Sequence, residues 1–93
     1  MVDPDHEFRL EREYRFAAPR KWRFDFCHRP SRVAIELEGG LHKFGRHQRP
    51  AGFTADCSKY FEATLLGFTV FRLPSAHITE EILTRIYGFI RRR

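Results

Sequence analysis

Hydrophobic and polar residues alternate along the first half of the chain, whereas apolar residues in the second half follow a helical spacing. The alternation predicts strands over 13–16, 21–27 and 33–38, separated by turn-forming stretches at 17–20 and 29–32. The second half predicts a helix over 53–66 that ends at Gly67, a strand over 68–73, and a last helix that begins after Thr79. A short charged helix is expected over 3–12.

The predicted order α-β-β-β-α-β-α describes one small α/β domain with a central mixed four-stranded sheet flanked by helices. A chain of 93 residues rarely builds two separate cores, so the core is expected within about 13–73, with flanking helices in 1–12 and 74–93. The 42% apolar share suits a folded domain. No apolar run has the roughly 20 residues of a membrane helix, and the acidic start is unlike a signal peptide. A cytoplasmic protein is therefore expected.

The charge distribution predicts a polyanionic partner. Seventeen Lys and Arg residues against twelve Asp and Glu residues give a net charge of +5, and residues 13–32 and 72–93 carry most of the excess. Fourteen of the bases are Arg, whose guanidinium binds phosphate oxygens in a bidentate manner. Arg-rich codon usage would account for part of this excess. Localised positive charge of this kind suits contacts with phosphate groups.

Two cysteines, Cys27 and Cys57, are too few and too far apart for a disulfide framework or a Cys-x-x-Cys zinc motif, so both are expected to be reduced thiols. A zinc site drawn from these cysteines together with His28, His42 and His47 is an alternative, but its ligands lack regular spacing.

Strand register brings acidic residues together. A hairpin centred on 29–32 pairs Phe24 with Leu37 and Phe26 with Ile35, so that these apolar residues share one face of the sheet. The same register places Asp25 opposite Glu36. Two carboxylates at facing positions repel each other, and a divalent cation with oxygen ligands would remove that cost. Glu38 comes next along the third strand.

The first hairpin extends the same row. Pairing Tyr14 with Phe24 through a turn at 18–20 places Glu13 opposite Asp25. The alternative is that these acids form salt bridges with Arg15, Arg23 and Arg32 on a solvated face.

A longer set of residues then resembles a known family. It consists of Phe24-Asp25-Phe26, Glu36-Leu37-Glu38-Gly39-Gly40, His42, Gly45-Arg46-His47, Asp56, Lys59-Tyr60, Gly67 and Arg72. Together these residues resemble the PD-(D/E)XK, or restriction-endonuclease-like, nuclease superfamily, and most closely the small phage and bacterial proteins akin to very-short-patch-repair endonucleases. The resemblance extends from about Glu13 to Leu73.

The resemblance implies an Mg²⁺-dependent DNA endonuclease, in which Mn²⁺ can substitute. Asp25 and Glu36 would bind the metal, with the backbone carbonyl of Leu37 as a third donor. The strand register, rather than the resemblance, adds Glu13 as a further candidate ligand. The family's Lys would fall at position 38, where this chain has Glu38.

Lys59 is therefore the candidate for the family's Lys, although it could instead pair with Asp56 one helical turn away. His42 resembles the His that assists proton transfer in the repair endonucleases. Phosphate contacts are expected from a small basic set: Arg23, Lys43, Arg46, His47 and Arg49.

Two other functions stay open. One is a nucleic-acid-binding module of the same fold without catalysis, for which Glu38 in place of Lys is the motivating feature. The other is an assembly protein that uses Phe-rich surface as an interface. A homodimer, in which two sites would cut two strands, is a further expectation for the nuclease.

Overall fold

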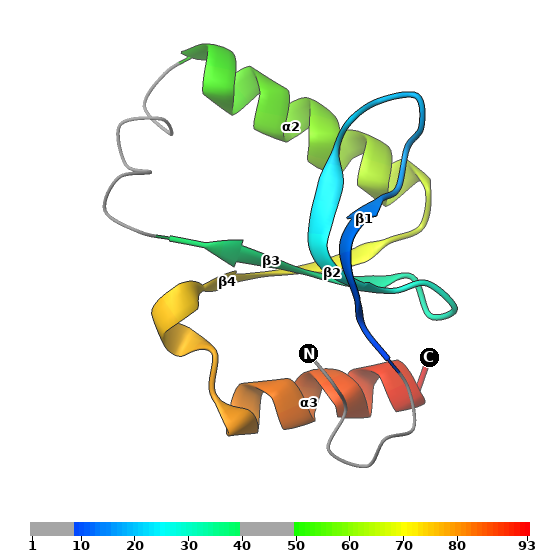
Figure 1. The fold of residues 1–93 in the computed structure, drawn as a ribbon, viewed down its shortest axis with the longest axis vertical. Helices are drawn as coiled ribbons and strands as arrows, with labels where there is room; N and C mark the ends of the chain where they lie inside the picture. Colours follow the sequence, from blue (N-terminus) through cyan, green and yellow to red (C-terminus); the bar gives the residue numbers. More distant parts are fainter. Residues whose placement is uncertain (1–8, 40–49) are drawn as a thin grey trace.

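The computed structural model describes residues 9–39 and 50–93. Its elements, in chain order, are β1 (Glu11–Arg15), β2 (Arg23–His28), β3 (Val33–Glu38), α2 (Pro50–Leu65), β4 (Thr69–Pro74), the short 3₁₀ helix η2 (Ser75–His77) and α3 (Glu80–Arg91). The strands form one sheet in the order β1-β2-β3-β4, with β3 and β4 parallel and the other pairs antiparallel (Figure 1). This arrangement confirms the predicted α/β class and the mixed four-stranded sheet.

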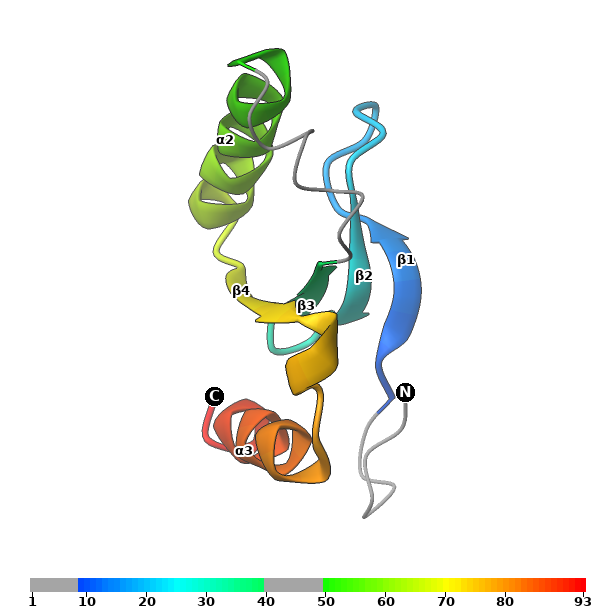
Figure 2. The ribbon, with the colours of Figure 1, turned by 90° about the vertical axis from the view of Figure 1, so that its left-hand side faces the viewer.

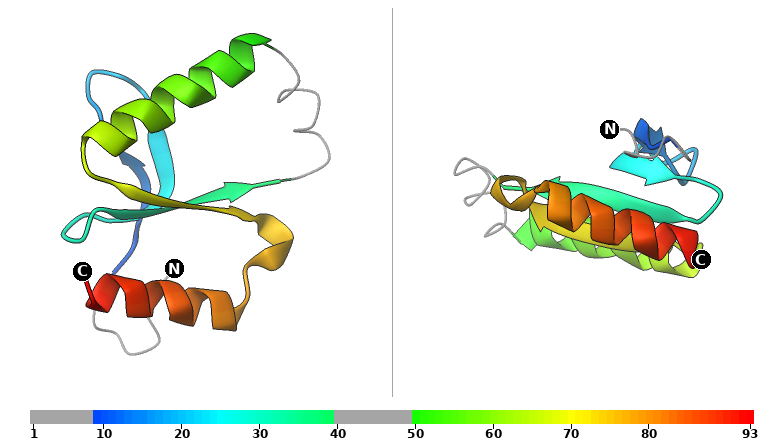
Figure 3. Two further views of the ribbon diagram at one scale, coloured as in Figure 1. Left: turned by 180° about the vertical axis from the view of Figure 1, so that it is seen from behind. Right: turned by 90° about the horizontal axis from the view of Figure 1, so that it is seen from below.

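The two long helices lie on opposite faces of the sheet, as Figures 1 and 2 show. The rear view in Figure 3 shows that α2 connects the parallel strands β3 and β4 across one face. Each face has its own core. Among the described residues, no helix has the length and apolar character needed to cross a bilayer.

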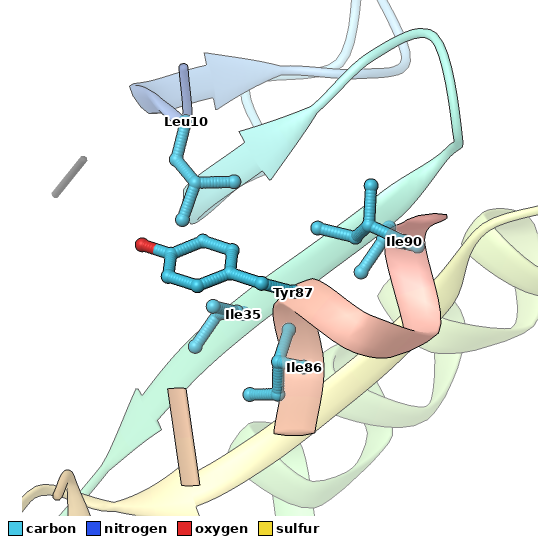
Figure 4. Close-up of a cluster of buried hydrophobic side chains, with 6 residues drawn as sticks. Leu10, Ile35, Ile86, Tyr87 and Ile90 are labelled. Atoms are coloured by element: carbon cyan, nitrogen blue, oxygen red, sulfur yellow. The ribbon is translucent and has the colours of Figure 1, made fainter. Parts of the chain in front are cut away.

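The core under α3 is built from apolar residues of the sheet, of the segment just before β1 and of α3 itself. Tyr87 of α3 lies beside Leu10 and Ile35 in Figure 4. The buried members of this cluster are Leu10, Val33, Ile35, Ile86, Tyr87 and Ile90.

The core under α2 is mostly aromatic. Phe16 and Phe24 stack with ring centroids 4.0 Å apart, and Phe68 packs on both. Its buried members are Phe16, Phe24, Cys27, Ala34 and Ala63.

The strand β2 changes face partway along its length. Phe24 belongs to the cluster under α2, whereas Phe26 packs against the cluster under α3. The prediction of one shared apolar face for both residues is therefore wrong. Regular alternation would keep residues two apart on one face, but β2 diverges from β3 beyond Phe26, and its first half turns toward α2 (Figure 1).

The strand β1 shows a similar change of face at Glu13. The predicted register is confirmed, because Tyr14 pairs with Phe24. Glu13 itself has φ 53°, in the left-handed region that non-glycine residues rarely occupy. As a result, Leu10 joins the core under α3 and Phe16 joins the core under α2.

The predicted helix over 3–12 is wrong where the structure describes it. Glu11 and Arg12 lie in β1 and pair with Cys27 and Phe26. Backbone pairing with β2 therefore outweighs the local helix propensity of these charged residues. Residues 3–8 lie outside the described residues.

One end of each long helix follows its sequence signal, whereas α2 begins at Pro50, three residues before the predicted start at Phe53. At the C-terminus of α2, Gly67 has φ 85°, its N–H donates to Thr64 O, and Phe68 N–H donates to Ala63 O, which is a Schellman motif. At the N-terminus of α3, Thr79 Oγ1 accepts a hydrogen bond from Ile82 N at 3.1 Å.

Replacing this cap tests the local account. Thr79→Ala should lower the free energy of unfolding by about 1 kcal/mol, because one backbone N–H of the first turn loses its partner. The matched control is Thr84→Ala, which makes the same change at an exposed position within α3 and should not destabilise. Urea denaturation measures both. Equal effects of the two substitutions would contradict the capping role.

Candidate functional site

The predicted acidic pair lies where β2 and β3 diverge. Backbone pairing between the strands covers Phe26 with Ile35, Cys27 with Ala34 and His28 with Val33, which is the predicted register. Beyond this point, side chains join the two strands. Asp25 Oδ2 accepts a hydrogen bond from Leu37 N at 2.7 Å, and Glu36 Oε2 accepts one from Asp25 N at 3.2 Å. The structure therefore brings Asp25 and Glu36 together.

Glu36 is the buried carboxylate of this pair, with 5% of its surface exposed. It lies on the face covered by α2, and that helix supplies a cation and a hydroxyl. Lys59 Nζ forms an ion pair with Glu36 Oε1, and Tyr60 OH donates to the same oxygen at 3.2 Å. Burial raises the pKa of Glu36, while the hydrogen bond and charge of Lys59 counteract part of that rise.

Glu38 occupies the position where the resemblance expects Lys, and it is held by a cation of β4. Arg72 Nε lies 2.7 Å from Glu38 Oε1. Tyr60 OH lies 3.5 Å from the same oxygen, and the Arg72 guanidinium stacks 4.4 Å from the Tyr60 ring centroid. Burial, followed by the negative charge of Glu36, raises the pKa of Tyr60, so its hydroxyl stays protonated and donates.

The carboxylates of β2 and β3, together with Lys59 and Tyr60 of α2, line one pocket of about 490 Å³. The β1–β2 hairpin forms another wall with Glu13, Lys21 and Arg23, so acidic and basic groups face the same space. The complete lining is Glu13, Lys21, Arg23, Asp25, Glu36, Leu37, Glu38, Gly52, Ala55, Asp56, Lys59 and Tyr60.

Glu13 contributes to this pocket from its edge. Its side chain is 54% exposed and lies 3.6 Å from Arg23 Nε. Within residues 9–39 and 50–93, no three or more His, Cys, Asp and Glu side chains are grouped so that they could hold a metal ion. The acids that the hydrogen bonds bring together are Asp25 and Glu36, next to the backbone of Leu37.

Part of the predicted site lies outside the described residues: His42, Lys43, Arg46, His47 and Arg49. Their roles stay predictions. Lys59 and Arg23, in contrast, both reach the pocket.

Two residues around the buried acid have no individual role in the sequence-based prediction: Tyr60 and Arg72. The strand register offers a signal for Arg72. Parallel pairing of β3 with β4 places Arg72 beside Glu36, and Glu38 is the next residue of β3 on the same face. A lone Arg in an otherwise apolar strand next to an acidic strand is a recognisable pattern. Tyr60 has no comparable signal, since a helical Tyr is usually a core residue.

The two cysteines are free, as predicted, but they differ in accessibility. Cys27 is buried in the core under α2, and Cys57 is exposed on that helix. Burial raises the pKa of Cys27 to about 12, so its reactive thiolate is scarce.

One thiol should therefore react in the native protein. At pH 8, a thiol reagent should modify Cys57 rapidly and Cys27 only after unfolding, and mass spectrometry of the modified peptides can assign both. Cys57→Ser should remove the fast phase. A fast reaction at Cys27 would contradict the described burial.

Comparison of the chain with protein-family models, with curated protein sequences and with solved structures finds no match.

Proposed function

We propose that this chain is a metal-dependent endonuclease that hydrolyses phosphodiester bonds of DNA. The observation that carries the proposal is the convergence of Asp25, Glu36 and Lys59 from three separate elements on one pocket. This combination suits phosphodiester hydrolysis. The carboxylates of Asp25 and Glu36 can hold a cation, and the ammonium group of Lys59 can stabilise negative charge.

The donor set fits a hard divalent cation such as Mg²⁺ or Mn²⁺, since it consists of oxygen atoms. Asp25 and Glu36 would hold the metal with the backbone carbonyl of Leu37, and Glu13 is a further candidate at the pocket edge. When bound, the metal would polarise the scissile phosphate and lower the pKa of a water molecule. Glu38 serves instead to fix Tyr60 and Arg72 around Glu36.

In this proposal Lys59 performs the function of the Lys that the resemblance would place at position 38. Its ammonium group offsets the charge of buried Glu36, and it can donate a hydrogen bond to a phosphate oxygen or to the attacking water. His42 is a second candidate for proton transfer.

The basic hairpin wall supports DNA as the substrate. Arg23 and Lys21 are exposed and lie on the pocket, where they can contact phosphates next to the scissile bond. Binding should weaken as salt rises, since cation–phosphate contacts release counterions. Repair, recombination or phage DNA processing inside the cell would use such an activity.

A second candidate is a nucleic-acid-binding module without catalysis. The ion pair between Glu38 and Arg72 favours it, because the residue at the family's Lys position is committed to a structural contact. This alternative predicts salt-sensitive DNA binding and no cleavage with any metal.

A substrate panel separates the two functions. Purified protein is incubated with labelled single-stranded, duplex, mismatched and four-way-junction DNA in Mg²⁺, Mn²⁺ or EDTA. The endonuclease proposal predicts cleavage of at least one substrate in metal and none in EDTA. Binding without cleavage under every condition would favour the non-catalytic module.

A further inference from the structure

The helix α2 has its largest apolar side chains on the side away from the sheet. Phe53, Phe61 and Leu65 are 63%, 62% and 66% exposed, and Cys57 is exposed as well. These four residues are spaced four apart and form one continuous row, which we name the outer stripe of α2. An amphipathic surface helix normally turns its apolar row toward the core, so this orientation is inverted.

The inner side of the same helix explains the inversion. It carries Lys59 and Tyr60, which contact Glu36, and Ala63, which is fully buried against the aromatic core. The inner positions are thus taken by polar site residues and a small residue, and the large apolar residues are left on the surface. Leu66, at the end of the helix, adds a further side chain that is 40% exposed.

We infer that the outer stripe of α2 binds the same stripe of a second copy of this chain. Side chains of Phe53, Phe61 and Leu65 expose on the order of 350 Å² per copy, given the size of aromatic and leucine side chains. In two copies these side chains would contribute about 700 Å², which is below the roughly 1,200 Å² of standard specific interfaces and in the range of weak, transient ones. The expected dimer is therefore small and dependent on protein concentration.

The charge and spacing of the stripe favour a copy of itself over a charged partner. A two-fold interface sets each surface against an identical one, so any ionised group near its centre would meet a like charge. The stripe and the exposed residues beside it, Thr54, Ser58 and Thr64, carry no ionisable group except the Cys57 thiol, and the half-buried Glu62 lies at the flank of the stripe and not at its centre.

An antiparallel pair of α2 helices uses every member of the stripe. Phe53 of one copy would face Leu65 of the second, and Cys57 would face Phe61. The two Cys57 residues would then be offset by about 6 Å along the helix axes. At an interaxial distance of about 8–10 Å, they are too far apart for a direct disulfide but within reach of a short bis-maleimide linker.

Because Lys59 lies on the opposite side of α2, this dimer would leave both pockets open. The inference does not depend on the proposed nuclease activity.

Sedimentation equilibrium over a range of protein concentrations tests the inference. The wild-type mass should rise from the 11.1 kDa of one chain toward twice that value, and Phe61→Asp should raise the dissociation constant by roughly 30-fold or more. Leu65→Asp serves as a second stripe variant, and circular dichroism checks that both variants fold. Thr84→Asp, an equal charge change at an exposed position of α3, should dimerise like the wild type.

Cross-linking then identifies the surface. A short bis-maleimide should link wild-type copies, but not Cys57→Ser or Phe61→Asp. A wild-type protein that stays at 11.1 kDa at its highest soluble concentration would overturn the inference. The inference would also be overturned if Phe61→Asp and Leu65→Asp still dimerised and the bis-maleimide did not link the wild-type copies.

Discussion

Lys59→Met is expected to lower the free energy of unfolding by about 3 kcal/mol at pH 7, since it leaves the buried carboxylate of Glu36 without its cation. The same substitution at Lys21, an exposed lysine on the same pocket, should change stability by less than about 0.5 kcal/mol. The double variant Lys59→Met/Glu36→Gln should recover much of the loss, because no charge is then buried alone. Urea denaturation measures all four proteins.

The stability that Lys59→Met loses should depend on pH in a defined direction. Burial already raises the pKa of Glu36, and removing Lys59 removes the opposing contribution. Folded Glu36 in the variant therefore holds its proton to higher pH than the unfolded chain does, so stability falls as pH rises from the ordinary Glu range toward the raised pKa. The difference in free energy of unfolding between Lys59→Met and the wild type should accordingly become smaller toward pH 4. A gap that widens on acidification, or a Lys59→Met protein as stable as the wild type at pH 7, would contradict the described ion pair.

Asp25→Asn and Glu36→Gln are expected to weaken Mn²⁺ binding by at least about 10-fold each, because an amide is a poorer ligand than a carboxylate for a hard cation. Electron paramagnetic resonance of free Mn²⁺ measures this directly in the absence of DNA. The matched control is Glu13→Gln, which changes a half-exposed carboxylate at the pocket edge and should have a smaller effect.

DNA binding should respond in the opposite way. Removing a carboxylate from Asp25 or Glu36 removes repulsion toward phosphate, so both variants should bind DNA at least as tightly as the wild type. For the metal itself, equal Mn²⁺ affinity in the wild type and in all three carboxylate variants would reject the assignment of Asp25 and Glu36 as the metal ligands.

The site's two acids are predictable from sequence because hairpin register is fixed by apolar matching. Once Phe26 faces Ile35, the neighbours Asp25 and Glu36 must be adjacent. Helix ends are equally local, as Gly67 and Thr79 illustrate.

The surroundings of those acids depend on tertiary packing instead. Alternation assigns Phe24 and Phe26 to one face, but the divergence of β2 from β3 separates them. Sequence spacing likewise cannot show that Lys59 approaches Glu36, since the two are 23 residues apart and come together only when α2 crosses the sheet. The left-handed backbone of Glu13 is invisible to periodicity for the same reason.

The most direct test of the nuclease assignment is a cleavage assay on the preferred DNA substrate with wild-type protein and Asp25→Asn purified in parallel. The account predicts cleavage by the wild type in Mg²⁺, none in EDTA, and a loss of at least about 1,000-fold in Asp25→Asn, the scale of removing a principal charge-stabilising group. Cleavage by Asp25→Asn at the wild-type rate would contradict it.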